Sequence, residues 1–180
     1  MCPDDNTIMS HVIAGEIEEM GLLYEKYKKP LYAYFFKITS GDNQTSEDLV
    51  HIVFYRAIRY KSTFSGGSFV NWLFKIAHNA SIDHNKKRMI KNNYQTEMMQ
   101  ITTVQYDDYD PEKKEQLALL EIALGKLNHD EKELIILGKI ESLKYKDIAE
   151  ITGISEGNVK IKMFRAIRKL KDIFMKIEKR

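Results

Sequence analysis

The sequence predicts an all-α protein, with two small helical domains joined by a flexible linker and a helix-turn-helix bundle as the C-terminal domain. Three observations support this prediction. Apolar residues recur at helical spacing, no strand-like alternation is present, and a polar segment without period separates two amphipathic regions. The chain has 180 residues, which fits one domain or two small ones. Its hydrophobic content of 43% can supply ordinary cores.

Residues 1–17 are expected to form an N-terminal tail, and residues 18–88 the first domain. The first helix is predicted over residues 18–40, because its apolar residues share one face and a Ser-Gly-Asp-Asn turn ends it. Ser46 is expected to cap the next helix, since two acidic residues follow it and favour the helix dipole. A third amphipathic run covers residues 69–83, after a glycine-containing break.

Residues 89–110 are predicted to be a linker that stays mobile unless a partner orders it, because they are polar and have no helical period. Residues 111–180 are expected to form the second domain. Pro111 fits the first position of a helix, where its missing N–H costs nothing. Asn128 lies in a turn and cap, and a further helix is expected over residues 131–140.

The last part of the chain has the pattern of a helix-turn-helix. Ala149 is a small residue where two helices would nearly touch, Gly153 can adopt a positive φ at the turn, and Val159 would anchor the second helix. Ser155 suits the N-cap of that second helix. Such a unit places the start of its second helix in the DNA major groove.

Charge is strongly segregated, although the net charge is only +2. Residues 56–91 carry +7 and residues 158–180 carry +7, counting Lys and Arg against Asp and Glu. Each block alone could be a solvated helix face. Two blocks, one of them on a helix-turn-helix, favour two sites that hold nucleic acid.

The outward face of the second helix supplies the candidate DNA-binding residues. Its first residues can read base edges, and the cations further along can hold phosphates. The alternative interpretation is an ordinary solvated face. The candidates are Ser155, Glu156, Asn158, Lys160, Ile161, Lys162, Arg165 and Lys169.

Read together, the two halves resemble a bacterial RNA polymerase sigma factor of the sigma-70 family, of the extracytoplasmic-function (ECF) type. The resemblance covers roughly residues 18–175. The motifs that carry it are Leu23–Tyr27, Glu47–Phe54, Phe64–Asn79, Leu124–Leu127, Tyr145–Gly153 and Ser155–Lys160.

This resemblance implies a transcription initiation factor that binds core RNA polymerase, directs it to promoters through −35 and −10 elements and aids promoter melting. The helix-turn-helix would read the −35 element. The polymerase-docking residues would be Asp48, Leu49, His51, Ile52 and Phe54. The −10 and melting residues would be Arg56, Arg59, Tyr60, Lys61, Phe64, Ser65, Trp72, Lys75 and Asn79.

The chemistry of promoter opening agrees with that second set, because aromatic faces beside cations can capture unstacked bases. Trp72 has two possible roles, since an aromatic residue at helical spacing also fits a core position. The partners that the resemblance implies are core polymerase, promoter DNA and an anti-sigma factor.

Other classes are disfavoured by the sequence. The five histidines lack metal-ligand spacing, and no glycine-rich phosphate loop is present, so neither an enzyme, a metal site, a cofactor nor a small-molecule substrate is expected. The single Cys2, an acidic N-terminus and the lack of a long apolar run favour a cytoplasmic protein without membrane insertion. The alternative function is a stand-alone helix-turn-helix regulator that binds a palindromic operator.

Overall fold

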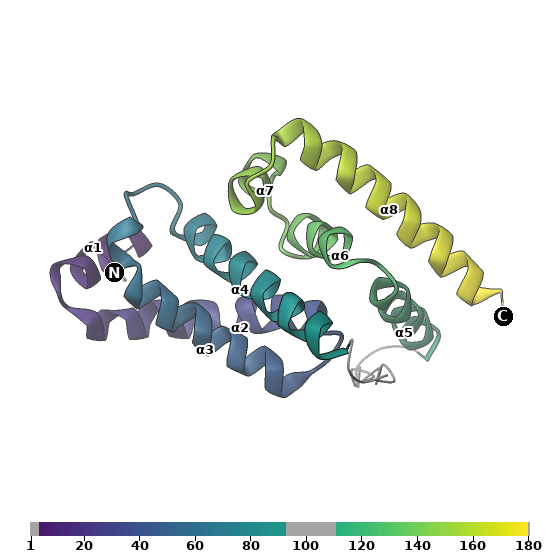
Figure 1. The fold of residues 1–180 in the computed structure, drawn as a ribbon, viewed down its shortest axis with the longest axis horizontal. Helices are drawn as coiled ribbons and strands as arrows, with labels where there is room; N and C mark the ends of the chain where they lie inside the picture. Colours follow the sequence, from purple (N-terminus) through teal and green to yellow (C-terminus); the bar gives the residue numbers. More distant parts are fainter. Residues whose placement is uncertain (1–3, 93–110, 180) are drawn as a thin grey trace.

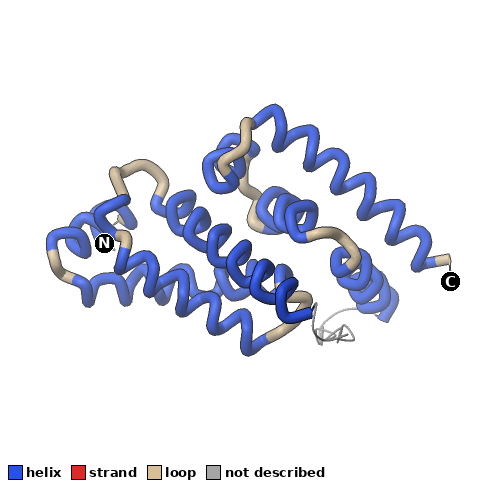
Figure 2. The backbone as a smooth tube through the Cα atoms, viewed as in Figure 1, coloured by secondary structure: helices blue, strands red, loops and turns tan. Residues whose placement is uncertain are grey.

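The computed structural model describes residues 4–92 and 111–179, and all regular structure in this part of the chain is helical (Figures 1 and 2). The predicted all-α fold is confirmed. The helices are α1 (Asp5–Ala14), η1 (Ile17–Glu19), α2 (Met20–Ile38), α3 (Asn43–Arg59), η2 (Lys61–Thr63), α4 (Phe69–Asn92), α5 (Pro111–Gly125), α6 (His129–Ile135), η3 (Ile136–Ile140), α7 (Tyr145–Thr152) and α8 (Glu156–Glu178).

The N-terminal domain is built on α2, α3 and α4, which pack on one another. Their apolar faces meet around Tyr34 and Phe35, which are fully buried. The N-cap of α3 differs from the expected one. Asp42 caps this helix by accepting the backbone N–H of Thr45, whereas Ser46 lies buried in its first turn. Asp42 is preferred because its carboxylate reaches an unpaired N–H three residues on.

Helix α1 occupies residues that were expected to form an N-terminal tail. Asp4 caps it, and Ile8, Met9 and Val12 bury their side chains in the core of the first domain. The hydroxyl of Tyr27 on α2 donates a hydrogen bond of 2.5 Å to Asp5. Burial and this carboxylate raise the pKa of Tyr27 to about 12. The helix is therefore part of the domain.

The C-terminal domain contains α5, α6, η3, α7 and α8. Its second helix starts with a capping box, in which the Asn128 side chain accepts the Glu131 N–H and the Glu131 carboxylate accepts the Asn128 N–H. The expected helix over residues 131–140 is observed, but as an α-helix that continues into the π-helical turn η3. Helix α4 runs to Asn92 and so includes residues 89–92 of the expected linker; residues 93–110 lie outside the described residues.

The two domains lie side by side and share a hydrophobic cluster. Helix α7 packs on α4, and α6 and η3 contact α2. Helix α8 contacts α5, α6 and α7 and forms the outer edge of the C-terminal domain, away from the N-terminal domain (Figure 1). The outer face of α8 thus remains uncovered by the rest of the described chain.

The helix-turn-helix depends on Gly153, which has φ 72° and ψ 15° in the left-handed region. A side chain in this conformation is strained by roughly 1–2 kcal/mol. We expect Gly153→Ala to lower the free energy of unfolding by about 1 kcal/mol in urea titrations. Gly157 is the matched control, because it lies in α8 without a positive φ and with open space at its Cβ position. Gly157→Ala should leave stability unchanged or raise it; equal losses in both variants would contradict the role given to Gly153.

Candidate nucleic-acid interface

The start of α8 is presented to solvent by the helix-turn-helix. The hydroxyl of Ser155 caps α8 by accepting the backbone N–H of Asn158 at 3.3 Å. Val159, Met163 and Ala166 are buried and hold the opposite face of the helix on the domain core. All eight residues predicted for this surface are exposed. They lie at the N-cap and on the first four turns of α8.

The four cations of this face differ in what they contact. The ammonium group of Lys160 lies 2.8 Å from Glu156, and that of Lys169 lies 2.7 Å from Glu131 on α6. Within the described ranges, neither Lys162 nor Arg165 has a carboxylate partner. Phosphates would therefore reach Lys162 and Arg165 without displacing an ion pair, whereas Lys169 is already engaged in holding α8 to α6.

A second basic and aromatic surface surrounds η2 and the start of α4. Trp72 is half-buried: its ring packs on Phe64 and Phe69, and its indole N–H donates to the Thr63 hydroxyl at 3.2 Å. Phe64 is itself buried, whereas Tyr60 is 45% exposed. In this conformation a base could stack on Tyr60 or reach an edge of Trp72, while Phe64 supports the Trp72 ring.

The cations of this surface are held by different neighbours. Arg56 pairs with Asp83 at 2.8 Å, and the guanidinium of Arg59 lies 5.6 Å from the centre of the Tyr60 ring. The ammonium group of Lys61 donates to the backbone carbonyl of Val12 in α1 at 2.8 Å. The remaining predicted residues are Ser65, Lys75 and Asn79, which are exposed. The N-terminal helix therefore braces η2, a contact that the sequence did not suggest.

The residues predicted for polymerase docking fall on two sides of α3. Asp48, His51 and Ile52 are exposed, and the His51 ring stacks beside Tyr24. Leu49 and Phe54 are buried in the domain core. A partner protein would reach the first three in this conformation, whereas the last two hold α3 in place.

Two exposed aromatic residues on these surfaces are not among the residues predicted from the sequence. Tyr55 on α3 is 65% exposed and Phe164 on α8 is 69% exposed. Each is one helical turn from a predicted residue, Ile52 and Ile161 respectively. The sequence could have indicated that both side chains are exposed, because each lies outside the apolar stripe of its helix.

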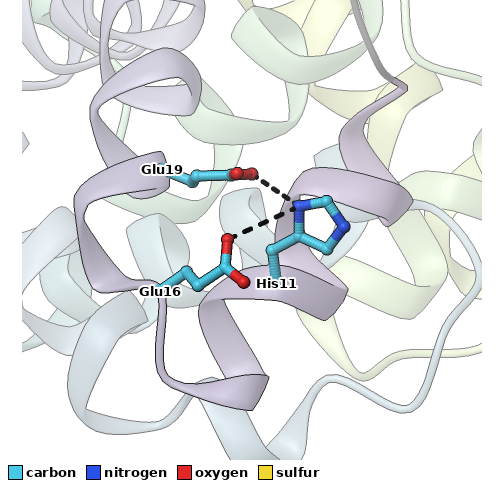
Figure 3. A group of neighbouring side chains, drawn as sticks. All are labelled: His11, Glu16 and Glu19. Atoms are coloured by element: carbon cyan, nitrogen blue, oxygen red, sulfur yellow. Dashed lines mark hydrogen bonds and ion pairs between the residues drawn. The ribbon is translucent and has the colours of Figure 1, made fainter.

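Three ligand-type side chains meet at the corner between α1 and η1, where Figure 3 shows His11, Glu16 and Glu19. The Nδ1 atom of His11 is 2.9 Å from Glu19 and 4.0 Å from Glu16. The hydrogen bond and the negative charge of Glu19 raise the pKa of His11. These residue types can bind a divalent cation, but an ion pair of protonated His11 with the two carboxylates accounts for the geometry.

Comparison with known protein families matches both halves of the chain. Residues 23–89 match the model of sigma-70 region 2, and residues 117–170 match that of sigma-70 region 4. The chain belongs to the sigma-70 family. The two surfaces described above fall within these two regions in the expected order.

Relatives with curated descriptions place it in the ECF group of this family. It is 33% identical over 162 residues to the ECF RNA polymerase sigma factor BldN of Streptomyces coelicolor, covering 87% of this chain and 61% of that protein's length. It is 30% identical over 156 residues to the ECF RNA polymerase sigma factor SigM of Bacillus subtilis, covering 84% of this chain and 93% of SigM.

Among solved structures, the chain is similar to the sigma factor RpoE of Bartonella quintana, which was crystallised with the anti-sigma factor NepR. The identity is 25% and the TM-score 0.71, with 88% of this chain and 98% of that chain covered. None of the described helices is long and apolar enough to cross a membrane.

Proposed function

We propose that this chain is an ECF-type sigma factor that binds core RNA polymerase, directs it to promoters through their −35 and −10 elements and aids promoter melting. The observation that carries the proposal is the order of two sigma-70 regions, each with its own exposed basic surface. The exposed face of α8 would read the −35 element. The surface around η2 and α4 would bind the −10 element, and the exposed residues of α3 would contact polymerase.

The stand-alone regulator is not favoured, because the region 2 match accounts for the N-terminal domain without a dimerisation or ligand-sensing role. An anti-sigma factor is the further partner we propose, on the basis that the Bartonella relative was crystallised with one. The proposed role is one of binding without catalysis, and it would place the chain in the cytoplasm with polymerase and chromosome.

The decisive test is an initiation assay with purified core polymerase and a promoter selected from random DNA by the complex. Formation of an open complex only when this chain is present would support the proposal. The chain without polymerase serves as the control. Tight binding of a palindromic site by the chain alone, with no effect on polymerase, would overturn the proposal.

Lys162 and Arg165 on α8, which have no carboxylate partner within the described ranges, lead to a prediction for −35 binding. We expect Lys162→Ala and Arg165→Ala each to weaken binding of the C-terminal domain's target duplex by about tenfold, and to reduce the slope of log K against log salt by about 1, because each removes one phosphate contact. Lys176→Ala is the matched control. Lys176 is exposed on the same helix, but it lies beyond the last candidate DNA-binding residue, Lys169. Binding titrations of the full chain at three salt concentrations measure this. An unchanged salt slope in both test variants would rule out phosphate contacts at these positions.

A further inference from the structure

One hydroxyl group joins η2 to α4 on the surface expected to bind the −10 element. The indole N–H of Trp72 on α4 donates to the Thr63 hydroxyl oxygen at 3.2 Å, and that hydroxyl donates to the backbone carbonyl of Tyr60 at 2.8 Å. The same carbonyl accepts the backbone N–H of Thr63, also at 2.8 Å. Thr63 therefore connects the side chain of Trp72 to the backbone of Tyr60, and both of these aromatic residues are partly exposed.

The direction of these hydrogen bonds follows from the chemistry of the groups. A threonine hydroxyl has one hydrogen and two lone pairs, an indole N–H can only donate, and a backbone carbonyl can only accept. The single hydrogen of the Thr63 hydroxyl is used on the Tyr60 carbonyl, so a lone pair remains for the Trp72 N–H. Valine has nearly the shape of threonine but can make neither bond, whereas serine can make both.

The other contacts of Trp72 support its ring without setting its angle. The ring centres of Phe64 and Phe69 lie 5.5 Å and 5.8 Å from that of Trp72, at interplanar angles of 65° and 42°. Apolar contacts of this kind depend little on direction. The hydrogen bond from the indole N–H to Thr63 is directional, because such bonds weaken steeply away from linear geometry. This bond therefore sets the orientation of the Trp72 ring on its apolar support.

The turn that carries Thr63 is itself held in place. The backbone N–H of Phe64 donates to the Lys61 carbonyl at 3.1 Å and so ends the turn η2. The Lys61 ammonium group donates to the Val12 carbonyl of α1, and Phe64 is buried. Thr63 thus presents its hydroxyl to Trp72 from a braced turn, although the residue is exposed.

Capture of unstacked bases is favoured when the aromatic rings that receive them are already in place. A side chain that becomes ordered only on binding loses conformational entropy at that moment, and this loss weakens binding. We propose that Thr63 is a positioning residue for promoter opening, which fixes the Trp72 ring relative to Tyr60 so that both can receive unstacked bases of the −10 element. This inference rests on the proposed function for its consequence, but the fixed orientation of Trp72 does not depend on that function.

Fluorescence of the free protein tests the fixed orientation, because Trp72 is the single tryptophan of the chain. Time-resolved anisotropy measures the nanosecond motion of its ring. We expect Thr63→Val to increase the amplitude of the fast component about twofold or more, because the ring loses its directional bond. Thr63→Ser should leave this amplitude at the level of the unsubstituted protein.

Thr7→Val is the matched control, because it makes the same chemical change at an exposed position of α1 where the hydroxyl donates to Asp4. The helical circular dichroism signal shows whether each variant is folded, and Thr63→Ala replaces Thr63→Val if the latter is unfolded. Equal fast components in all four proteins would overturn the proposal, whatever the protein's function.

Binding of single-stranded DNA by the complex with core polymerase tests the consequence. The probes are two oligonucleotides with the −10 sequence of the selected promoter, one for each strand. For the strand that binds more tightly, we expect Thr63→Val to weaken binding about fivefold, the factor that corresponds to loss of one hydrogen bond. Binding of the −35 duplex should be unchanged, and Thr63→Ser should bind the single strand as the unsubstituted protein does.

The outcomes separate the role of Thr63 from the proposed function. Unchanged single-strand binding by Thr63→Val, or equal losses in Thr63→Val and Thr63→Ser, would overturn the proposal. Failure of the unsubstituted complex to bind either oligonucleotide, with the anisotropy results as expected, would instead contradict the proposed function.

Discussion

Met9→Ala is expected to lower the free energy of unfolding of the N-terminal domain by about 3 kcal/mol. Met9 is fully buried, and truncation of a buried methionine leaves a cavity and removes apolar contacts. Ile13 is the matched control, because it lies on the same helix and is 39% exposed. Ile13→Ala should change stability by about 0.5 kcal/mol or less. Urea titrations of the full chain measure both values.

The same substitution should also affect promoter opening. Helix α1 supplies the Val12 carbonyl that holds the Lys61 side chain, so loosening α1 releases the segment expected to bind the −10 element. We expect Met9→Ala to reduce open-complex formation more strongly than it reduces binding of a −35 duplex. Small and equal stability losses for Met9→Ala and Ile13→Ala would show that α1 is not docked as described.

The local elements could be predicted from the sequence because their signals are local. Gly153 and Ser155 mark the turn and the cap of the helix-turn-helix within three residues, and both were observed in those roles. The N-cap of α3 was harder to predict, because Asp42 and Ser46 are both good capping residues. Their difference arises from packing: the Ser46 hydroxyl lies in the core, 3.0 Å from that of Thr39.

Helix α1 and the polar contacts between the two domains depend on pairings that the sequence pattern does not contain. The segment from Asp5 to Ala14 is only ten residues long, so it resembles a tail until α2 is present to cover its apolar residues. Asn71, Lys132 and Glu133 are residue types that usually lie at the surface. Their partners are distant in the sequence, with Glu133 and Tyr34 separated by 99 positions. Only the packed domains reveal that these polar residues are buried.

Replacement of Lys132 by methionine is expected to raise the free energy of unfolding by about 2 kcal/mol at pH 7. Burial, together with the nearby charge of Arg88, lowers the pKa of Lys132 from 10.5 to about 8. Such a shift corresponds to a cost of roughly 3 kcal/mol for keeping the amine protonated in the folded protein. Loss of the hydrogen bond to Ser40 offsets about 1 kcal/mol of the gain. Lys139→Met is the control, since Lys139 is exposed on the π-helical turn η3 that follows α6.

The dependence on pH distinguishes this explanation from a simple gain in apolar burial. Between pH 8 and about 10.5 the unfolded chain keeps the Lys132 proton that the folded protein has lost, so the stability of the unsubstituted protein should rise with pH in this range. Above pH 10 the trend is opposed, because burial raises the pKa of Tyr34 well above 10 and the unfolded tyrosine ionises first. Urea titrations at pH 7, 8 and 9.5 should therefore show a rise that is present in Lys139→Met and absent in Lys132→Met. A parallel rise in both variants would mean that Lys132 is not the group responsible.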